Sequence, residues 1–320
     1  MNKTLGLIGM TMTSMLALTA ATSAQDYPVD TVTMVVPYAA GGAGDIVGRL
    51  VADELATRLG VTFVVENVGG ASGTIGAEQV SRAAPDGATL LLAGNAIFTT
   101  APHLADVGFD PFTDFTPIAN VSEAVRMLVS SKTLDVATVE EFVAYAKEHP
   151  GELNYGSVGV GSTGHVATVD MLNVMGIEAT HIPYKGASEV VQAVLAGDIQ
   201  FMLDAAAVAQ ARQDTVTALA VPGSEHLAEF PDVRSLKDLG YDSISGTGWQ
   251  LVAAPAGLAP DVVAMIETAL LEASEDPEFT DKLVKAGVSP RFMTSSMLDS
   301  ALRSDYDRFG ELLGTLGLAK

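Results

Sequence analysis

The chain alternates between short apolar strands and amphipathic helices, and this alternation starts twice. A strand predicted at Thr31–Val36 leads into a glycine-rich turn and a helix, and a second strand predicted at Asn154–Ser157 does the same. Further strands are expected at residues 63–66, 89–92, 179–183, 199–203 and 217–221. Such alternation indicates an α/β fold with mainly parallel sheets covered by helices.

Two extended stretches, residues 115–130 and 248–257, interrupt this alternation. The simplest architecture is two α/β lobes joined by two crossing strands, with a cleft between them. We expect lobe I to comprise residues 25–122 plus 251–320 and lobe II to comprise residues 123–250. The tail after residue 257 contains only predicted helices and must therefore pack on an existing sheet.

Residues 1–24 have the pattern of a signal peptide. Lys3 is followed by an apolar stretch and then by Ala21-Thr22-Ser23-Ala24, a run of small residues that suits cleavage. The alternatives are a membrane anchor or a buried helix, but the stretch is short for a span and contains Thr and Ser. We therefore expect an exported, periplasmic protein whose mature chain begins at Gln25.

The composition excludes several classes of function. The chain has no cysteine, which removes disulfides, thiol nucleophiles and thiolate metal sites. It has 39 Asp and Glu against 17 Lys and Arg, so no basic surface for nucleic acid is expected. The five histidines are dispersed and match no metal-binding spacing, so we predict neither a metal nor another cofactor.

The first glycine-rich turn has the composition of an anion-binding loop. Gly41 and Gly42 follow the first strand, and Asp45 lies in the first turn of the next helix. Backbone N–H groups at such a turn bind a phosphate or a carboxylate. Glu66 lies near the position of a ribose-binding acid, which favours a nucleotide, whereas Asp45 would repel a pyrophosphate. A tight turn without a ligand is the third alternative.

The second glycine-rich turn, residues 159–164, also has the composition of an anion-binding loop. It contains G-x-G-x-x-G, and the hydroxyls of Ser162 and Thr163 together with helix N–H groups suit a carboxylate or a phosphate. His165 is expected either to contact the ligand or to serve as a core or capping residue. After the third strand, Thr99 and Thr100 either face the cleft or cap a helix.

The order of motifs resembles one family over essentially the whole mature chain. The segments VVPYAAGGAGD, VVENVGGASGTIGAEQVSRAAPDGATLL, DPFTDFTPIANV, PGELNYGSVGVGSTGHVA, HIPYKGASEVVQAVLAGDIQFMLD, ALAV and GWQLVAAPAGLAP are similar to those of tripartite tricarboxylate transporter receptors, the Bug-type periplasmic binding proteins. The resemblance implies a type II periplasmic binding protein fold. It implies a receptor, not an enzyme, that captures a small carboxylate by lobe closure and delivers it to membrane transport subunits, and we expect a monomer.

The resemblance also assigns ligand contacts. It places Tyr38 to Asp45, Gly161 to His165, and Asp204 around the ligand, with Asp45 organising bridging waters. Phe98, Ala101 and Ala205 stand where many relatives have polar residues, which suggests a smaller or less polar distal end of the ligand. Two alternatives remain open at this point: an NAD(P)-dependent enzyme and a ligand-sensing partner of a membrane signalling protein.

Overall fold

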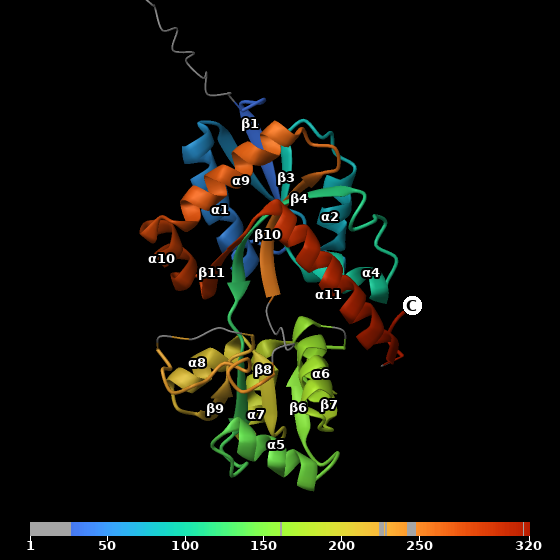
Figure 1. Cartoon of the computed structure of the whole chain (residues 1–320), viewed down its shortest axis with the longest axis vertical. Coiled ribbons are helices and arrows are strands. Elements are labelled where there is room, and N and C mark those ends of the chain that lie inside the picture. The colour runs from blue at the N-terminus through green and yellow to red at the C-terminus, as the bar shows by residue number, and fades with distance from the viewer. Residues whose placement is uncertain (1–26, 161, 224–226, 228, 242–247, 316) are drawn as a thin grey trace, which may run out of the picture.

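The structure is a computed structural model that describes residues 27–160, 162–223, 227, 229–241, 248–315 and 317–320. The predicted signal peptide, residues 1–24, lies outside the described residues. Figure 1 shows the two sheets stacked along the long axis of the molecule, each with its own helices. We call the part built on the larger sheet lobe I and the other part lobe II.

Lobe I contains a six-stranded sheet in the order β11-β4-β10-β3-β1-β2. The strand β1 pairs in parallel with β2 and β3, whereas β10 runs antiparallel to β3 and β4, and β11 runs antiparallel to β4. The strands are β1 (Thr31–Val36), β2 (Thr62–Asn67), β3 (Thr89–Gly94), β4 (Phe115–Ala124), β10 (Gly248–Pro255) and β11 (Val288–Met293).

Lobe II contains a five-stranded sheet in the order β7-β6-β8-β5-β9. Here β6 pairs in parallel with β7 and β8, and β5 lies antiparallel between β8 and β9. The strands are β5 (Met127–Ser131), β6 (Asn154–Ser157), β7 (Thr180–Pro183), β8 (Phe201–Asp204) and β9 (Val216–Ala220).

The two sheets share one topology. In each, the first strand lies between the second and third, and a strand that arrives from the other part of the chain is inserted antiparallel beside the third. Both glycine-rich turns therefore occupy the same place, after the central parallel strand of their sheet. Ligands bind at the carboxyl ends of parallel strands in open α/β sheets, so this symmetry places two equivalent turns at one cleft.

Helices cover both faces of the lobe I sheet, because its strands bury side chains on both sides. Val32, Met34 and Val36 face α1, α9 and α10, whereas Val35 faces α2, α3 and α11. The helices are α1 (Ala43–Leu59), α2 (Thr74–Ser81), α3 (Ala96–Thr99), α4 (Ala101–Leu104), α9 (Pro260–Ser274), α10 (Pro277–Lys285) and α11 (Ser295–Thr315), with a short 3₁₀ turn at Ala71–Gly73.

The lobe II sheet is covered in the same manner. Leu128 contributes to a core with α5 and α6, whereas Met127 and Val129 contribute to a core with α7 and α8. The helices are α5 (Val139–Glu148), α6 (Thr163–Met175), α7 (Ala187–Ala196) and α8 (Ala206–Arg212). Thr138 caps α5, since its Oγ1 accepts the Glu141 N–H at 3.1 Å.

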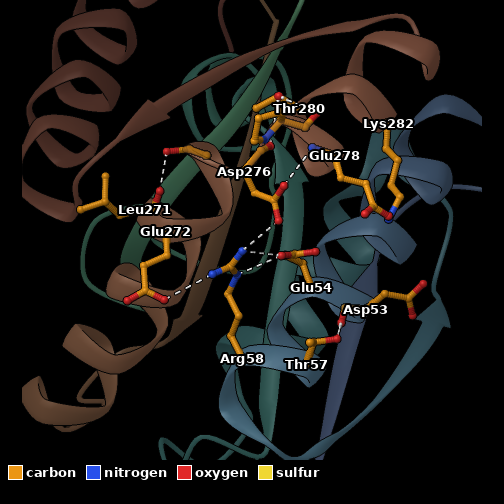
Figure 2. Close-up of polar contacts among 12 residues, drawn as sticks. Asp53, Glu54, Thr57, Arg58, Leu271, Glu272, Asp276, Glu278, Thr280 and Lys282 are labelled. Atoms are coloured by element: carbon orange, nitrogen blue, oxygen red, sulfur yellow. Dashed lines mark hydrogen bonds and ion pairs between the residues drawn. The ribbon is translucent and has the colours of Figure 1, made fainter.

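The C-terminal helices tie the end of the chain to both lobes. Arg58 of α1 forms ion pairs with Glu54 at 2.8 Å, with Glu272 at 3.3 Å and with Asp276 at 3.5 Å, as Figure 2 shows. These contacts hold α9 and α10 against α1. The helix α11 starts on lobe I and ends with Phe309, Leu312 and Leu313 in the core of lobe II.

The predicted α/β fold with two lobes is confirmed, and one prediction about the tail is wrong. The tail contains a strand, β11, which pairs with β4 at the edge of the sheet. The sequence VSPRFM includes a proline and pairs with a register shift, so it lacks the alternation that marks a strand. The lobe I sheet also continues past residue 122, to Ala124, and β10 begins before residue 251, at Gly248.

Candidate functional site

A cleft of about 920 Å³ lies between the two lobes. Lobe I lines it with the turns that follow β1, β2 and β3, and lobe II lines it with the start of α6. The wall is completed by Ala124 of β4, by Gly248, Trp249 and Gln250 of β10, and by Arg126, which lies between β4 and β5. A cavity of this size at the strand ends is where small molecules bind in such folds.

Tyr38 presents a protonated hydroxyl to this cleft. Its oxygen accepts the Gly94 N–H at 2.7 Å, and burial raises the pKa of Tyr38 above its ordinary value. The hydroxyl therefore keeps its proton at neutral pH and has it available for an anionic ligand. Gly44 makes room for the ring, since a Cβ at that position would lie 2.4 Å from Tyr38 Cδ2.

Asp45 holds the first glycine-rich turn from within. Its Oδ2 accepts the Gly41 N–H at 2.8 Å and Arg49 Nε at 3.0 Å, and its Oδ1 accepts Asn67 Nδ2 at 2.8 Å. The Arg49 guanidinium, followed by the Gly41 N–H, lowers the pKa of Asp45 to about 2. Asp45 does not line the cleft, and its contacts shape the loop that does.

The second glycine-rich turn opens the N-terminus of α6 to the cleft. Ser162 is the N-cap, and its Oγ accepts the His165 N–H at 3.3 Å. Thr163 Oγ1 accepts a hydrogen bond from Arg126 Nη2 at 2.8 Å. The N-terminus of a helix carries partial positive charge, so this arrangement favours an anion.

His165 lies behind this turn and does not line the cleft. Its ring stacks on His181 with centroids 3.9 Å apart, and His181 Nε2 contacts Ser157 Oγ at 2.7 Å. Burial lowers the pKa of His165, and burial together with the charge of His165 lowers that of His181 to about 4. Both rings are therefore neutral at neutral pH and support the turn by packing.

The remaining predicted residues are distributed around the cleft. Thr100 lines it, and Thr99 lines a smaller cavity beside it while donating to the Asn95 carbonyl at 3.0 Å. Gly41 and Gly42 are exposed and lie outside the lining. Asp204 also lies outside the lining, near Gly164, whose Cβ would be 3.4 Å from Asp204 Oδ2. Gly161 lies outside the described residues. The ligand contacts themselves stay predictions.

Trp249, Gln250 and Arg126 are among the cleft residues that reasoning from the sequence missed. Trp249 and Gln250 lie in a predicted extended stretch and were not assigned a site role. Arg126 lies in the other predicted extended stretch, residues 115–130, between the apolar residues Val125 and Met127. A charged residue in an apolar stretch was the feature of the sequence that could have identified it. A charge in a stretch that must be buried needs a partner or a ligand.

Other kinds of site find little support in the part of the chain that the structure describes. No group of three or more histidine and acidic side chains there is arranged to hold a metal ion. No helix in that part is long and apolar enough to cross a membrane. Glu66, the candidate ribose ligand of the dinucleotide alternative, does not line the cleft.

The two lobes and the cleft between them define a solute-binding protein. The family model described as "Tripartite tricarboxylate transporter family receptor" matches residues 47–318. The chain therefore belongs to this family of receptors.

Known proteins of the same kind are similar along nearly their whole length. A "UPF0065 protein in gbd 5'region" of Cupriavidus necator is 32% identical over 305 residues, 95% of this chain and 93% of that protein. The periplasmic binding protein BugD has a solved structure with a TM-score of 0.70 and 30% identity, covering 92% and 100% of the two chains. Rpa4515 of R. palustris, solved with adipate, gives a TM-score of 0.73 and 29% identity over 92% and 99%.

Proposed function

We propose that this receptor captures a small carboxylate in the interlobe cleft and delivers it to the membrane components of a tripartite tricarboxylate transporter. The observation that carries the proposal is the convergence of Tyr38 from lobe I and the α6 N-terminus with Thr163 from lobe II on one cleft. An anion that contacts both lobes stabilises their closed arrangement. The solved relative with adipate supports the same chemistry.

Local donors outweigh the acidic character of the chain. Its formal net charge is -22, which repels an anion at a distance, but repulsion is screened beyond about 8 Å at physiological salt. A hydrogen bond to a charged group contributes about 1.5–3 kcal/mol, so four or five of them, less the costs of desolvation and closure, reach the roughly 8 kcal/mol of micromolar binding.

The site supports binding rather than catalysis. We propose that the chain acts in the periplasm after removal of residues 1–24, as a receptor and not as an enzyme. We also propose that residues 25–122 plus 251–320 form one moving lobe and residues 123–250 the other.

A thermal-shift screen tests the proposal. The mature chain is heated with mono-, di- and tricarboxylates and with NAD and NADP. A ligand at about a hundredfold excess over its Kd stabilises the native state by about 2.7 kcal/mol. We expect a shift with one carboxylate class and none with the nicotinamide cofactors. A shift with NAD or NADP alone would refute the proposal.

A further inference from the structure

Asn95 is a buried polar residue in the wall of the cleft. It lies between β3 and α3, its exposed fraction is only 4%, and it lines both the cleft and a smaller cavity beside it. Thr100 of lobe I and Thr163 of lobe II also line both spaces. The side chain of Asn95 is therefore placed where the two lobes face one another.

Trp249 fixes the orientation of the Asn95 amide. The Asn95 backbone N–H donates to the Trp249 carbonyl at 3.0 Å, and the Trp249 backbone N–H donates to Asn95 Oδ1 at 3.1 Å. A backbone N–H can only donate, so the side-chain atom that faces it has to be the amide oxygen. The Nδ2 group, with its two N–H donors, is the other end of the amide.

The two N–H donors of Asn95 Nδ2 have no protein acceptor among the residues that the structure describes. Buried polar groups in proteins nearly always have a hydrogen-bond partner, supplied by the protein, by water or by a ligand. Asn95 borders a cleft that is large enough for a small molecule. Its Nδ2 group is therefore available to a ligand in that cleft.

An amide N–H2 group held in one orientation distinguishes an oxygen from an ammonium group. It donates to a carbonyl or hydroxyl oxygen, whereas an ammonium has only donors and leaves the amide donors unpaired. The hydroxyls of Thr100 and Thr163 can rotate to suit either group. None of the described residues that line the small cavity is acidic, so an ammonium finds no counter-charge there.

Asn95 also adjoins the groups to which we assign the ligand carboxylate. The Tyr38 hydroxyl accepts the Gly94 N–H at 2.7 Å, and Gly94 immediately precedes Asn95. Thr163, the contact from lobe II, borders the same small cavity as Asn95. A carboxylate bound by Tyr38 and Thr163 therefore brings its neighbouring carbon, and the group on that carbon, next to Asn95.

We propose that Asn95 is a specificity-determining residue, which donates from Nδ2 to an oxygen on the carbon next to the ligand carboxylate and thereby selects 2-oxo and 2-hydroxy acids over 2-amino acids. This inference rests on the proposed function, that a carboxylate binds in the interlobe cleft.

The test compares acids that differ only in this group. Binding of pyruvate and alanine, of malate and aspartate, and of 2-oxoglutarate and glutamate is measured by titration calorimetry at pH 7.5 on the mature protein. We expect the wild type to bind the oxygen-bearing acid of a pair at least about tenfold more tightly than the amino acid.

Two variants separate the contact from a general effect of charge. Asn95→Ala removes the donors without adding a charge, so the preference should fall to about twofold, mainly through weaker binding of the oxygen-bearing acid. Asn95→Asp keeps an oxygen for the Trp249 N–H but replaces the donors by an acceptor, so the preference should reverse in favour of the amino acid. If Asn95→Ala does not fold, Asn95→Asp decides.

Asn173→Asp is the matched control. Asn173 is an exposed residue of α6 that lines neither the cleft nor the small cavity. The substitution adds the same charge as Asn95→Asp and should leave the preference unchanged.

The outcomes separate the two claims. The role of Asn95 is overturned, and the receptor function stands, if the wild type binds both acids of each pair equally, or binds other carboxylates but neither acid of any pair. A full preference retained in the deciding Asn95 variant has the same meaning. A wild type that binds no carboxylate at all overturns both claims.

Discussion

Replacing Asp305 by asparagine should stabilise the protein, and only above about pH 4. Asp305 is a buried residue of α11, with an exposed fraction of 8%. Its Oδ1 contacts Arg308 Nη2 at 3.3 Å, and Arg308 Nη1 in turn contacts Asp170 of α6 at 3.1 Å. Burial, together with the charge of Asp170, raises the pKa of Asp305 from 3.8 to about 6, although Arg308 and Arg291 oppose the shift.

The sign follows from proton binding. Between about pH 4 and pH 6 the folded protein holds a proton on Asp305 that the unfolded chain has released, so stability falls as the pH rises through this window. A shift of about two units at roughly 1.4 kcal/mol each gives a cost of up to about 3 kcal/mol above pH 6. Asparagine is neutral and still accepts from Arg308, so it removes most of this cost.

Urea unfolding at pH 4 and at pH 7.5 measures the effect. We expect Asp305→Asn to raise the free energy of unfolding by about 2 kcal/mol at pH 7.5 and to change it little at pH 4. The control is Asp307→Asn, an exposed residue of the same helix, which removes the same charge. An equal change in the free energy of unfolding at both pH values, or a loss of stability at pH 7.5, would contradict the raised pKa of Asp305.

Three further predictions concern the first lobe. Arg58→Gln removes the cation shared by Glu54, Glu272 and Asp276. It should lower the free energy of unfolding by about 1–2 kcal/mol in low salt and by less in about 1 M NaCl. Urea titrations that show the same loss at both salt concentrations would contradict this. Asp45→Asn weakens the hydrogen bonds that hold the first glycine-rich turn and should lower the free energy of unfolding by about 2 kcal/mol at pH 7. This stabilisation by Asp45 is present above the unfolded pKa of about 4 and is lost as the pH falls toward 2. An unchanged urea midpoint at pH 7 would argue against it. Tyr38→Phe leaves the Gly94 N–H without its acceptor and removes a donor to the ligand, so calorimetry should show about tenfold weaker carboxylate binding, and unchanged affinity would exclude contact with the ligand.

The sequence was sufficient for the local structure of the parallel strands. Thr31–Val36 and Asn154–Ser157 form strands with the expected bounds, because in each case a glycine-rich turn and a helix follow directly and mark where the strand ends. The edge strand β11 was not predictable, because Pro290 and its polar neighbours gain their pairing from β4 rather than from their own pattern.

The site was predictable only where one short segment carries it. The two glycine-rich turns can be identified from their composition, and the repeated topology of the two sheets places both turns at one cleft. The environment of His165 depends on His181, and that of Arg126 depends on Thr163 and Asp204, which tertiary folding brings together from separate elements. Because these partners lie at no characteristic spacing in the sequence, the contacts between them could not be predicted from it.

Trp249 can report directly whether a carboxylate binds between the lobes. It is the single tryptophan of the chain, it lines the cleft, and its N–H and carbonyl are held by Asn95. Its fluorescence is followed while the mature protein is titrated with whichever acid stabilises it most against heat. We expect a saturable change with one site per chain, abolished when Tyr38 and Thr163 are replaced together. A stabilising acid that leaves Trp249 fluorescence unchanged and binds the double variant equally well would place the ligand outside this cleft.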